Sequence, residues 1–170
     1  MKTILFMVQT VNGIIAGEDG RPPGSDVEME EFRRVAEESR NIIIGRTSYE
    51  SMARLGVFED GHYRGSEVVV VSRGEDIKGF KTVDSPAAAV EHARSQGYER
   101  AHVAGGGVIA AAFLEEDLID EVWVDIEPKI ISRGDNFVDA QVADLQVDMK
   151  LIEQKMISEG VIQLRYEVVK

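Results

Sequence analysis

Short, near-continuous apolar runs recur along this chain of 170 residues, and they constrain its fold more than any other feature. Most of them lack the alternation of apolar and polar residues that is typical of a strand with one solvated face. We therefore expect strands that are buried on both faces of a mostly parallel sheet. The expected strands are residues 3–8, 41–44, 68–71, 101–104 and 121–126.

Segments with helical patterns lie between these runs. The segment from Asp26 carries apolar residues on one side, and Ser85-Pro86 is typical of an N-cap followed by the first helical residue. Strands that alternate with helices through right-handed crossovers predict an α/β sandwich. The expected helices are residues 26–39, residues 86 to about 96, and the alanine-rich residues 108–116.

The C-terminal part of the chain has a different pattern. Residues 149–158 and 161–169 flank Glu159-Gly160, which indicates an antiparallel hairpin at one edge of the sheet. The sequence contains no internal repeat and no low-complexity stretch. We therefore expect residues 1–170 to form a single domain.

The composition excludes several classes of function. The formal net charge of −12 argues against nucleic acid or an anionic membrane as the main partner. Because no apolar run approaches the ~20 residues of a membrane span, we expect a cytoplasmic protein. Cysteine is absent, so disulfides and thiol chemistry are excluded. His62, His92 and His102 lack the spacing of metal ligands, and we expect no metal site.

Three of the expected strands end in residues that could bind an anion. Residues 45–48 (GRTS) follow the second strand and open a short helix, whose N-terminal amides attract phosphate. Residues 72–74 (SRG) follow the third strand. Taken alone, each of these two segments fits a capped helix or a strand end better than a binding site. Residues 105–107 are three glycines at a strand–helix junction, and their cost in backbone entropy favours a binding role.

The three segments are expected at one edge of the sheet, because parallel α/β sheets bind ligands at the carboxyl ends of their strands. The glycines do not have the spacing of the GxGxxG fingerprint, so a standard Rossmann site is not predicted. A dinucleotide with an extra phosphate would fit, with its pyrophosphate at the glycines and its 2′-phosphate between Arg46 and Arg73. The sequence therefore favours NADPH over NADH.

Four segments resemble motifs of the dihydrofolate reductase superfamily, and they occur in that family's order. They read GRTSYES from Gly45, VVVVSR from Val68, AGGGVIAAAF from Ala104 and GDNF from Gly134. The resemblance implies a dihydrofolate reductase-like three-layer sandwich. It also implies an NADPH-dependent reductase that transfers hydride to a pteridine, with 7,8-dihydrofolate reduced to tetrahydrofolate as the expected reaction.

The resemblance also implies roles for individual residues. Residues 15–28 resemble the mobile loop over the nicotinamide and the start of the helix at the pteridine site, which makes Glu28 the catalytic carboxylate. Such a carboxylate can pair with an aminopyrimidine edge, and burial would raise its pKa. Glu31 and Asp26 are the competing carboxylates. The implied substrate residues are Val8, Glu28, Phe32 and Met52. The implied cofactor residues are Ile15, Ala16, Arg46, Thr47, Ser48, Ser72, Arg73, Gly105, Gly106, Gly107, Val108 and Ile109.

The sequence departs from the family pattern at several positions. Pro23 stands in place of the loop tryptophan, and Asp125 stands in place of a threonine that usually bonds the catalytic carboxylate. Ser66 falls where the family has an arginine that grips the folate glutamate tail, and Arg64 lies two residues away.

A second resemblance covers the C-terminal half. LIDEVWVDIEPKIISRG, from Leu118, resembles the reductase domain of riboflavin biosynthesis, which reduces a ribosylamino-pyrimidine phosphate with NADPH. Asn12-Gly13-Ile14 differs from the Asp-Gly-Lys of that family. The alternatives are therefore a reductase of riboflavin biosynthesis and a non-catalytic NADPH-binding homologue. The partner is a small molecule in each case, and the protein is a monomer or a homodimer.

Overall fold

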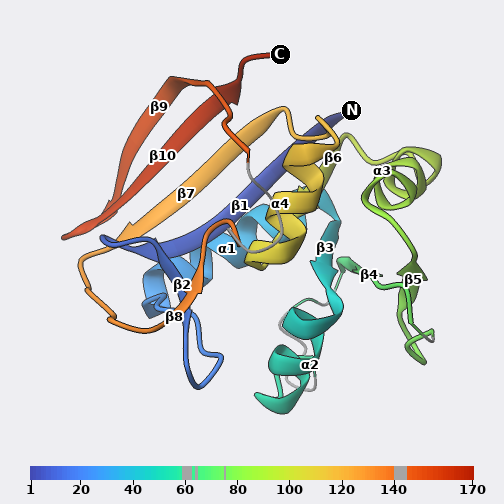
Figure 1. Ribbon diagram of the computed structural model, residues 1–170, viewed down its shortest axis with the longest axis horizontal. Helices are drawn as coiled ribbons and strands as arrows, with labels where there is room; N and C mark the ends of the chain where they lie inside the picture. Colours follow the sequence, from blue (N-terminus) through green and yellow to red (C-terminus); the bar gives the residue numbers. More distant parts are fainter. Residues whose placement is uncertain (59–62, 64, 75, 140–144) are drawn as a thin grey trace.

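The chain folds around one large β-sheet. The structure, a computed structural model, describes residues 1–58, 63, 65–74, 76–139 and 145–170, and the large sheet within them has eight strands. Their order across the sheet is β5-β4-β3-β6-β1-β7-β10-β9 (Figure 1). These strands are β1 (Lys2–Thr10), β3 (Asn41–Gly45), β4 (Glu67–Val71), β5 (Lys81–Val83), β6 (Arg100–Val103), β7 (Glu121–Glu127), β9 (Met149–Ser158) and β10 (Val161–Val168).

The strands from β5 to β7 pair in parallel, and β10 pairs antiparallel with both β7 and β9. The hairpin of β9 and β10 forms one edge of the sheet (Figure 1). The prediction of a mostly parallel α/β sheet with a C-terminal antiparallel hairpin is therefore confirmed. The register of the central pair aligns Val8 of β1 with Asp125 of β7, so both side chains lie on the same face.

Helices cover both faces of the sheet. On one face, α1 packs its Val35 against Phe6 of β1 and Trp123 of β7. On the other face, Leu5 of β1 belongs to a larger core cluster that contains Phe113 of α4. Alternate residues of β1 thus face opposite helical layers, as expected for a strand that is buried on both sides. The helices in the described part of the chain are α1 (Asp26–Ser39), α2 (Arg46–Arg54), α3 (Pro86–Ser95) and α4 (Gly107–Glu115).

The helix starts follow from local sequence. Ser25 caps α1 by accepting a hydrogen bond from the Glu28 amide, and Ser85 caps α3 by accepting one from Ala88. By contrast, α2 and α4 begin after glycines, Gly45 and Gly106, which supply no side-chain cap. The first-turn amides of these two helices therefore remain suited to bind an anion.

Three short strands were not expected from the sequence. Besides β5, β2 (Ile14–Gly17) and β8 (Gly134–Asn136) pair antiparallel as a separate ribbon. The ribbon places Asp135 opposite Ala16, although the two residues are far apart in the chain. Segments of three or four residues are too short to show a strand period. The ribbon matters because it forms one wall of the cleft described below.

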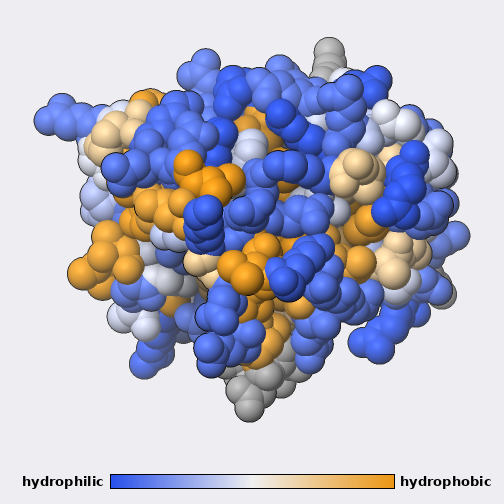
Figure 2. Space-filling model, turned by 90° about the horizontal axis from the view of Figure 1, so that it is seen from above, coloured by the Kyte–Doolittle hydropathy of each residue, from blue (hydrophilic) through white to orange (hydrophobic). Residues whose placement is uncertain are grey.

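Hydrophilic side chains predominate on the face of the molecule that Figure 2 shows. Figure 2 shows one face, on which apolar side chains form smaller groups among hydrophilic ones. The outer strand β9 is exposed over most of its length and carries Met149, Leu151 and Met156 at the surface. In the described residues, no helix is long and apolar enough to cross a bilayer.

Candidate active site

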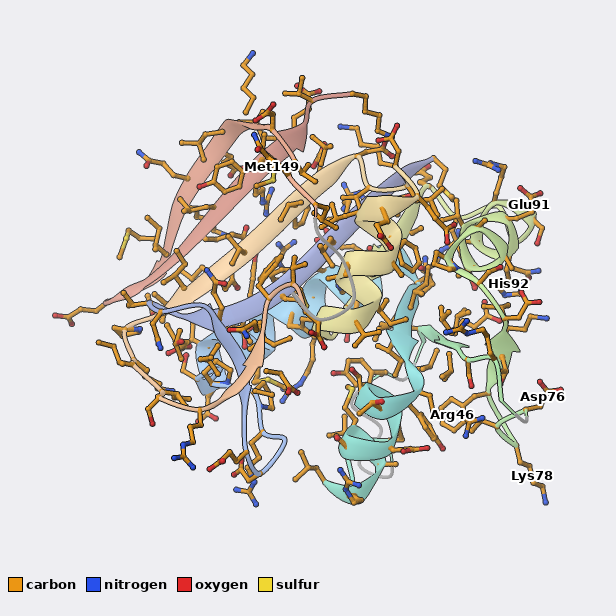
Figure 3. All side chains as sticks on the ribbon, viewed as in Figure 1. Arg46, Asp76, Lys78, Glu91, His92 and Met149 are labelled. Carbon is orange, nitrogen blue, oxygen red and sulfur yellow. The ribbon has the colours of Figure 1, made fainter. Side chains whose placement is uncertain are left out.

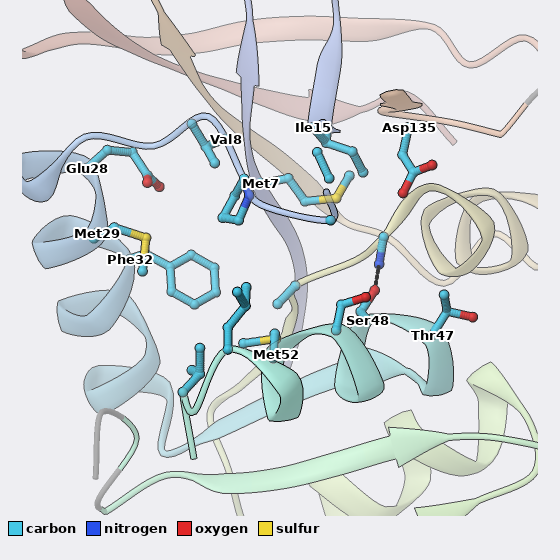
Figure 4. Close-up of a pocket in the computed structure, with 18 of the residues that line it drawn as sticks. Met7, Val8, Ile15, Glu28, Met29, Phe32, Thr47, Ser48, Met52 and Asp135 are labelled. Carbon is cyan, nitrogen blue, oxygen red and sulfur yellow. Dashed lines mark hydrogen bonds between the residues drawn. The ribbon is translucent and has the colours of Figure 1, made fainter. Parts of the chain in front are cut away.

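A cleft lies where β1, β3 and β6 reach their carboxyl ends (Figure 4). It encloses about 970 Å³, part of which is open to solvent. Val8 belongs to the floor from β1, Thr47 and Ser48 follow β3, and Gly106 follows β6. The side walls come from α1, α2 and the β2–β8 ribbon. The position of the cleft matches the ligand site of parallel α/β sheets.

Glu28 is the buried carboxyl group of this cleft. Its side chain is fully buried in the first turn of α1, and in the described part of the chain neither carboxyl oxygen has a hydrogen-bond partner. Burial, together with the negative charge of Asp125, raises its pKa to about 8. A β-carbon on Gly24 would overlap Glu28 Oε2, so the backbone there covers the carboxyl group closely. Glu28 is thus a largely protonated group at neutral pH that is ready to accept a ligand.

The remaining wall around Glu28 is largely apolar. Val8, Phe32 and Met52, which the sequence assigns to the substrate, all line the cleft with Glu28 (Figure 4). Phe32 packs on Phe6 with ring centroids 5.5 Å apart. An apolar wall beside one carboxyl group favours a flat ring that presents N–H donors at one edge.

The two competing carboxylates lie elsewhere. Glu31 accepts two hydrogen bonds from Arg34, at 2.8 and 3.0 Å, and a third from Lys155 at 3.3 Å. The hydrogen bonds from Arg34 are the main cause that lowers its pKa to about 2. Asp26 is exposed on the first turn of α1. Geometry therefore favours Glu28 among the three.

Ser48 connects the first and third predicted anion segments, residues 45–48 and 105–107. Its hydroxyl accepts a hydrogen bond of 2.8 Å from the Gly106 amide, as the dashed line in Figure 4 shows. The Gly105–Gly106 peptide bond is cis. Ile15, Ala16 and Thr47 line the same cleft as Ser48 and Gly106. Five of the predicted cofactor residues are therefore brought together in the cleft.

The first turn of α4 contains the next predicted cofactor residues. Gly107 lies so close to the Asn136 carbonyl that a β-carbon would clash with it, and Ile109 packs against Gly45 in the same way. Val108 is half exposed. Glycines at positions 45 and 107 thus let the start of α4 lie against both β3 and β8, with its N-terminal amides near the cleft.

Arg46, Ser72 and Arg73 lie at the outer end of this edge. Arg46 Nε donates to Ser72 Oγ at 2.7 Å, and the same oxygen accepts from the Gly74 amide at 3.1 Å. Arg46 also lies 3.7 Å from Glu50. Arg73 is exposed. Figure 3 shows Arg46 between α2 and the β4–β5 region. The structure thus joins Arg46 and Ser72 directly, outside the cleft that contains Glu28.

Hydrogen bonds hold the segment between β2 and α1 against the end of β7. Glu127 Oε1 accepts from the Ser25 amide at 2.7 Å, and Lys129 Nζ donates to the Pro23 carbonyl. Pro23, which stands in place of the family's tryptophan, is buried under these contacts.

Ser66, which stands where the family has the arginine that grips the folate tail, donates to the Ala36 carbonyl at 3.0 Å and therefore has a structural contact. Arg64 lies outside the described residues.

Several lining residues were not found from the sequence. Asp135 lines the cleft from β8, although its motif GDNF was recognised only as a family feature. Met29 follows Glu28 directly, and Tyr63 enters the cleft from a distant loop. Burial raises the pKa of Tyr63 to about 12, so its hydroxyl stays protonated. Met29 could have been found from the position of Glu28, whereas no pattern in the sequence marks Tyr63.

The fold is that of dihydrofolate reductase-like proteins, as comparison with solved structures shows. A putative riboflavin biosynthesis protein from Shewanella sp. PV-4 has a TM-score of 0.77 at 19% identity, and 100% of each chain is covered. A pyrimidine reductase-like protein from Corynebacterium diphtheriae has a TM-score of 0.78 at 12% identity, covering 99% of this chain and 92% of that one. Dihydrofolate reductase from Enterococcus faecalis, complexed with NADP(H) and RAB-propyl, has a TM-score of 0.74 at 15% identity, covering 99% of this chain and 97% of that one.

The chain belongs to the family of the RibD C-terminal domain, whose model matches residues 1–163. No curated protein sequence matches it. The resemblance to the dihydrofolate reductase superfamily, with similarity to the riboflavin reductase domain, is therefore confirmed.

Proposed function

We propose that this chain is an NADPH-dependent reductase that transfers hydride to a small molecule with an aminopyrimidine ring. The observation that carries the proposal is Glu28, a fully buried carboxyl group without a partner in the described residues, in a largely apolar cleft. Burying such a group is costly unless a ligand satisfies it. The two oxygens of one carboxylate match the two adjacent N–H donors of an aminopyrimidine edge.

The residues present fit a dinucleotide. The uncapped start of α4 and the amide-rich segment at residues 105–109 suit a pyrophosphate, and Arg46 with Ser72 suits a 2′-phosphate further along the same edge. Ile15 and Ala16 would cover the nicotinamide, because both line the cleft and a β-carbon on Gly106 would contact Ile15. NADPH, when bound, supplies the hydride. Similarity to a reductase complexed with NADP(H) supports this choice.

Within this proposal, Glu28 has two tasks. It holds the ring edge in the apolar cleft, and because its raised pKa leaves it protonated at neutral pH before the substrate binds, it can give that proton to the ring as the ring edge binds. Phe32 and Met52 hold the ring faces and exclude water, and Val8 forms the floor. The ring then stays in one orientation beside the nicotinamide end of the cleft, which lowers the entropic part of the barrier.

Two substrates fit this description. Family membership over residues 1–163 supports the ribosylamino-pyrimidine phosphate of riboflavin biosynthesis. The isolated carboxyl group of Glu28 and the similarity to dihydrofolate reductase support 7,8-dihydrofolate, reduced to tetrahydrofolate. Both compounds offer an aminopyrimidine edge to Glu28. They differ in what extends from it, which is a ribose phosphate in one and a glutamate tail in the other.

The test is an assay of NADPH oxidation by the full chain, run in parallel with dihydrofolate and with the ribosylamino-pyrimidine phosphate as substrates. We expect turnover with one of them, and loss of that turnover in Glu28→Gln. Glu31→Gln is the matched control, because Glu31 is a carboxylate of the same helix that already has basic partners. Tight NADPH binding without turnover of either compound would overturn the enzyme proposal and leave the non-catalytic NADPH-binding homologue.

A further inference from the structure

Asp125 is a second buried carboxyl group beside the cleft. It is fully buried on β7, its Cα partner on β1 is the cleft residue Val8, and both side chains lie on the face that α1 covers. Asp125 Oδ1 accepts a hydrogen bond of 2.9 Å from Gln163 Nε2, whereas Oδ2 has no partner in the described residues. The proposed reaction leaves this second carboxyl group unexplained.

The orientation of Asp125 is set from β10. Arg165 Nε donates to Gln163 Oε1 at 2.7 Å, and a guanidinium can only donate hydrogen bonds. The amide group of Gln163 must therefore turn its NH₂ toward Asp125. Arg165 is itself held by Glu153 at 2.9 Å and lies 3.8 Å over the Trp123 ring. This chain of contacts uses Oδ1 and leaves Oδ2 available.

Three buried carboxyl oxygens therefore lack partners in the part of the chain that the structure describes. They are both oxygens of Glu28 and Oδ2 of Asp125. Burial and the negative charge of Asp125 raise the pKa of Glu28 to about 8, and burial raises the pKa of Asp125 itself to about 7. Glu28 lies in the cleft wall with its carboxyl group toward Val8 (Figure 4).

Other charged groups around the pair already have partners. Glu31 is ionised by its contacts with Arg34 and Lys155, and it lies 3.9 Å from Arg165. Glu127 accepts from the Ser25 amide and lies 3.6 Å from Lys129, whose positive charge only partly offsets the repulsion on Glu28. The nearby Tyr63 keeps its proton, because burial raises its pKa to about 12.

We propose that Asp125 is a second carboxyl group of the substrate site, and that Glu28 and Asp125 together select a cationic, N–H-rich ring edge such as an aminopyrimidinium or another cyclic guanidinium. A protonated aminopyrimidine presents a ring N–H and both hydrogens of its amino group, so it offers three donors for three oxygens. Both carboxyl groups must be ionised to accept them. Binding of one cation therefore releases up to two protons from the pair. The inference rests on the proposed function only for the location of the substrate.

The test measures how the affinity of the full chain for 2-amino-2-imidazoline, a cyclic guanidinium that stays cationic throughout, changes with pH. In the wild type, we expect the dissociation constant to fall about 100-fold for each unit by which the pH rises, as long as the pH is below about 6.5. This slope corresponds to two released protons, and the dissociation constant should level off above pH about 8. Calorimetry at several pH values gives this slope directly.

Asp125→Asn keeps the oxygen that accepts from Gln163 and replaces the other by an NH₂ group. We expect its slope to fall to about tenfold per pH unit, since only Glu28 then releases a proton. Glu121→Gln is the matched control, because Glu121 is a buried carboxylate of the same strand that already accepts from Trp123. Its slope should stay at the wild-type value. A tenfold slope in the wild type, or an unchanged slope in Asp125→Asn, would overturn the inference.

A second measurement needs no variant. Carbon-13 NMR of the wild-type carboxyl groups should show two of them with titration midpoints above pH 6. Saturation with 2-amino-2-imidazoline should shift both midpoints below pH 6. A single such group would contradict the inference. Neither experiment uses NADPH, so failure of the reductase assay and failure of the two-carboxyl inference remain distinguishable.

Discussion

Arg46 Nε donates to Ser72 Oγ at 2.7 Å and thereby joins the first residue of α2 to the end of β4. The contact brings together residues 45–48 and 72–74, the two segments that the sequence predicts on either side of a 2′-phosphate. The same guanidinium lies 3.7 Å from Glu50, and a guanidinium is a strong hydrogen-bond donor to phosphate. Arg46 and Ser72 are therefore a preformed pair at the place where a 2′-phosphate is expected.

Arg46→Ala and Arg73→Ala should weaken NADPH much more than NADH. We expect a loss of about tenfold or more in NADPH affinity for each variant, since a charge-assisted contact to phosphate contributes about 1.5–3 kcal/mol. Fluorescence titration with both cofactors gives the ratio. Arg94→Ala is the control, because Arg94 is an exposed residue of α3 paired with Glu91. An equal loss for both cofactors in Arg46→Ala would contradict the 2′-phosphate assignment.

Glu28→Gln should lower turnover by about 10²–10⁴-fold, because the amide can neither hold the ring edge as a carboxylate nor supply its proton. NADPH affinity should stay within about twofold, since the cofactor residues lie at the other end of the cleft. Steady-state kinetics and cofactor titration on one preparation separate the two effects. Wild-type rates in this variant would move the catalytic role to another group.

Gly24→Ala should act through Glu28. A β-carbon at position 24 overlaps Glu28 Oε2, and the flexible side chain is the partner that must move. We expect turnover to fall about tenfold, with little loss of stability, because misplacing one catalytic group is costly for rate. In the Glu28→Gln background the same change should have little further effect. Additive losses in the double variant would show that Gly24 acts on something other than Glu28.

The sheet was predictable because its strands carry their signal locally. Runs such as residues 68–71 are long, apolar and bounded by polar turns, and the structure has β4 at Glu67–Val71. The start of α1 was equally readable, because Ser25 is a strong N-cap that fixes the helical position of Glu28. The three anion segments could be predicted in the same way, because each one directly follows a strand that the sequence predicts.

The remaining features depend on contacts between distant residues. The β2–β8 ribbon pairs residues 14–17 with residues 134–136, and neither segment is long enough to show a period. The hydrogen bond between Gln163 and Asp125 depends on the antiparallel register of β10 on β7. The resemblance to the dihydrofolate reductase superfamily implied that Asp125 stands in place of a threonine, but only the structure shows that Oδ1 accepts from Gln163 while Oδ2 has no partner in the described residues.

The raised pKa of Glu28 predicts how stability depends on pH. The pKa of a Glu side chain in the unfolded chain is near 4.5, and in the folded protein that of Glu28 is about 8. Between these values the folded state keeps a proton that the unfolded state releases, so the free energy of unfolding falls as the pH rises, by up to about 1.4 kcal/mol per pH unit. Glu28→Gln should abolish this contribution, and the variant should therefore gain stability relative to the wild type from pH 5 to pH 8.

Urea unfolding at pH 5, 6, 7 and 8 measures that difference. Asp125 contributes a pH dependence of the same sign, but it is present in both proteins and largely cancels. Glu121→Gln is the control, because contacts with Lys2 and Trp123 lower the pKa of Glu121 against its burial. Its carboxylate is ionised in both states over this range, so that variant should lose stability by a nearly constant amount. A constant difference between wild type and Glu28→Gln would mean that Glu28 is not the protonated group.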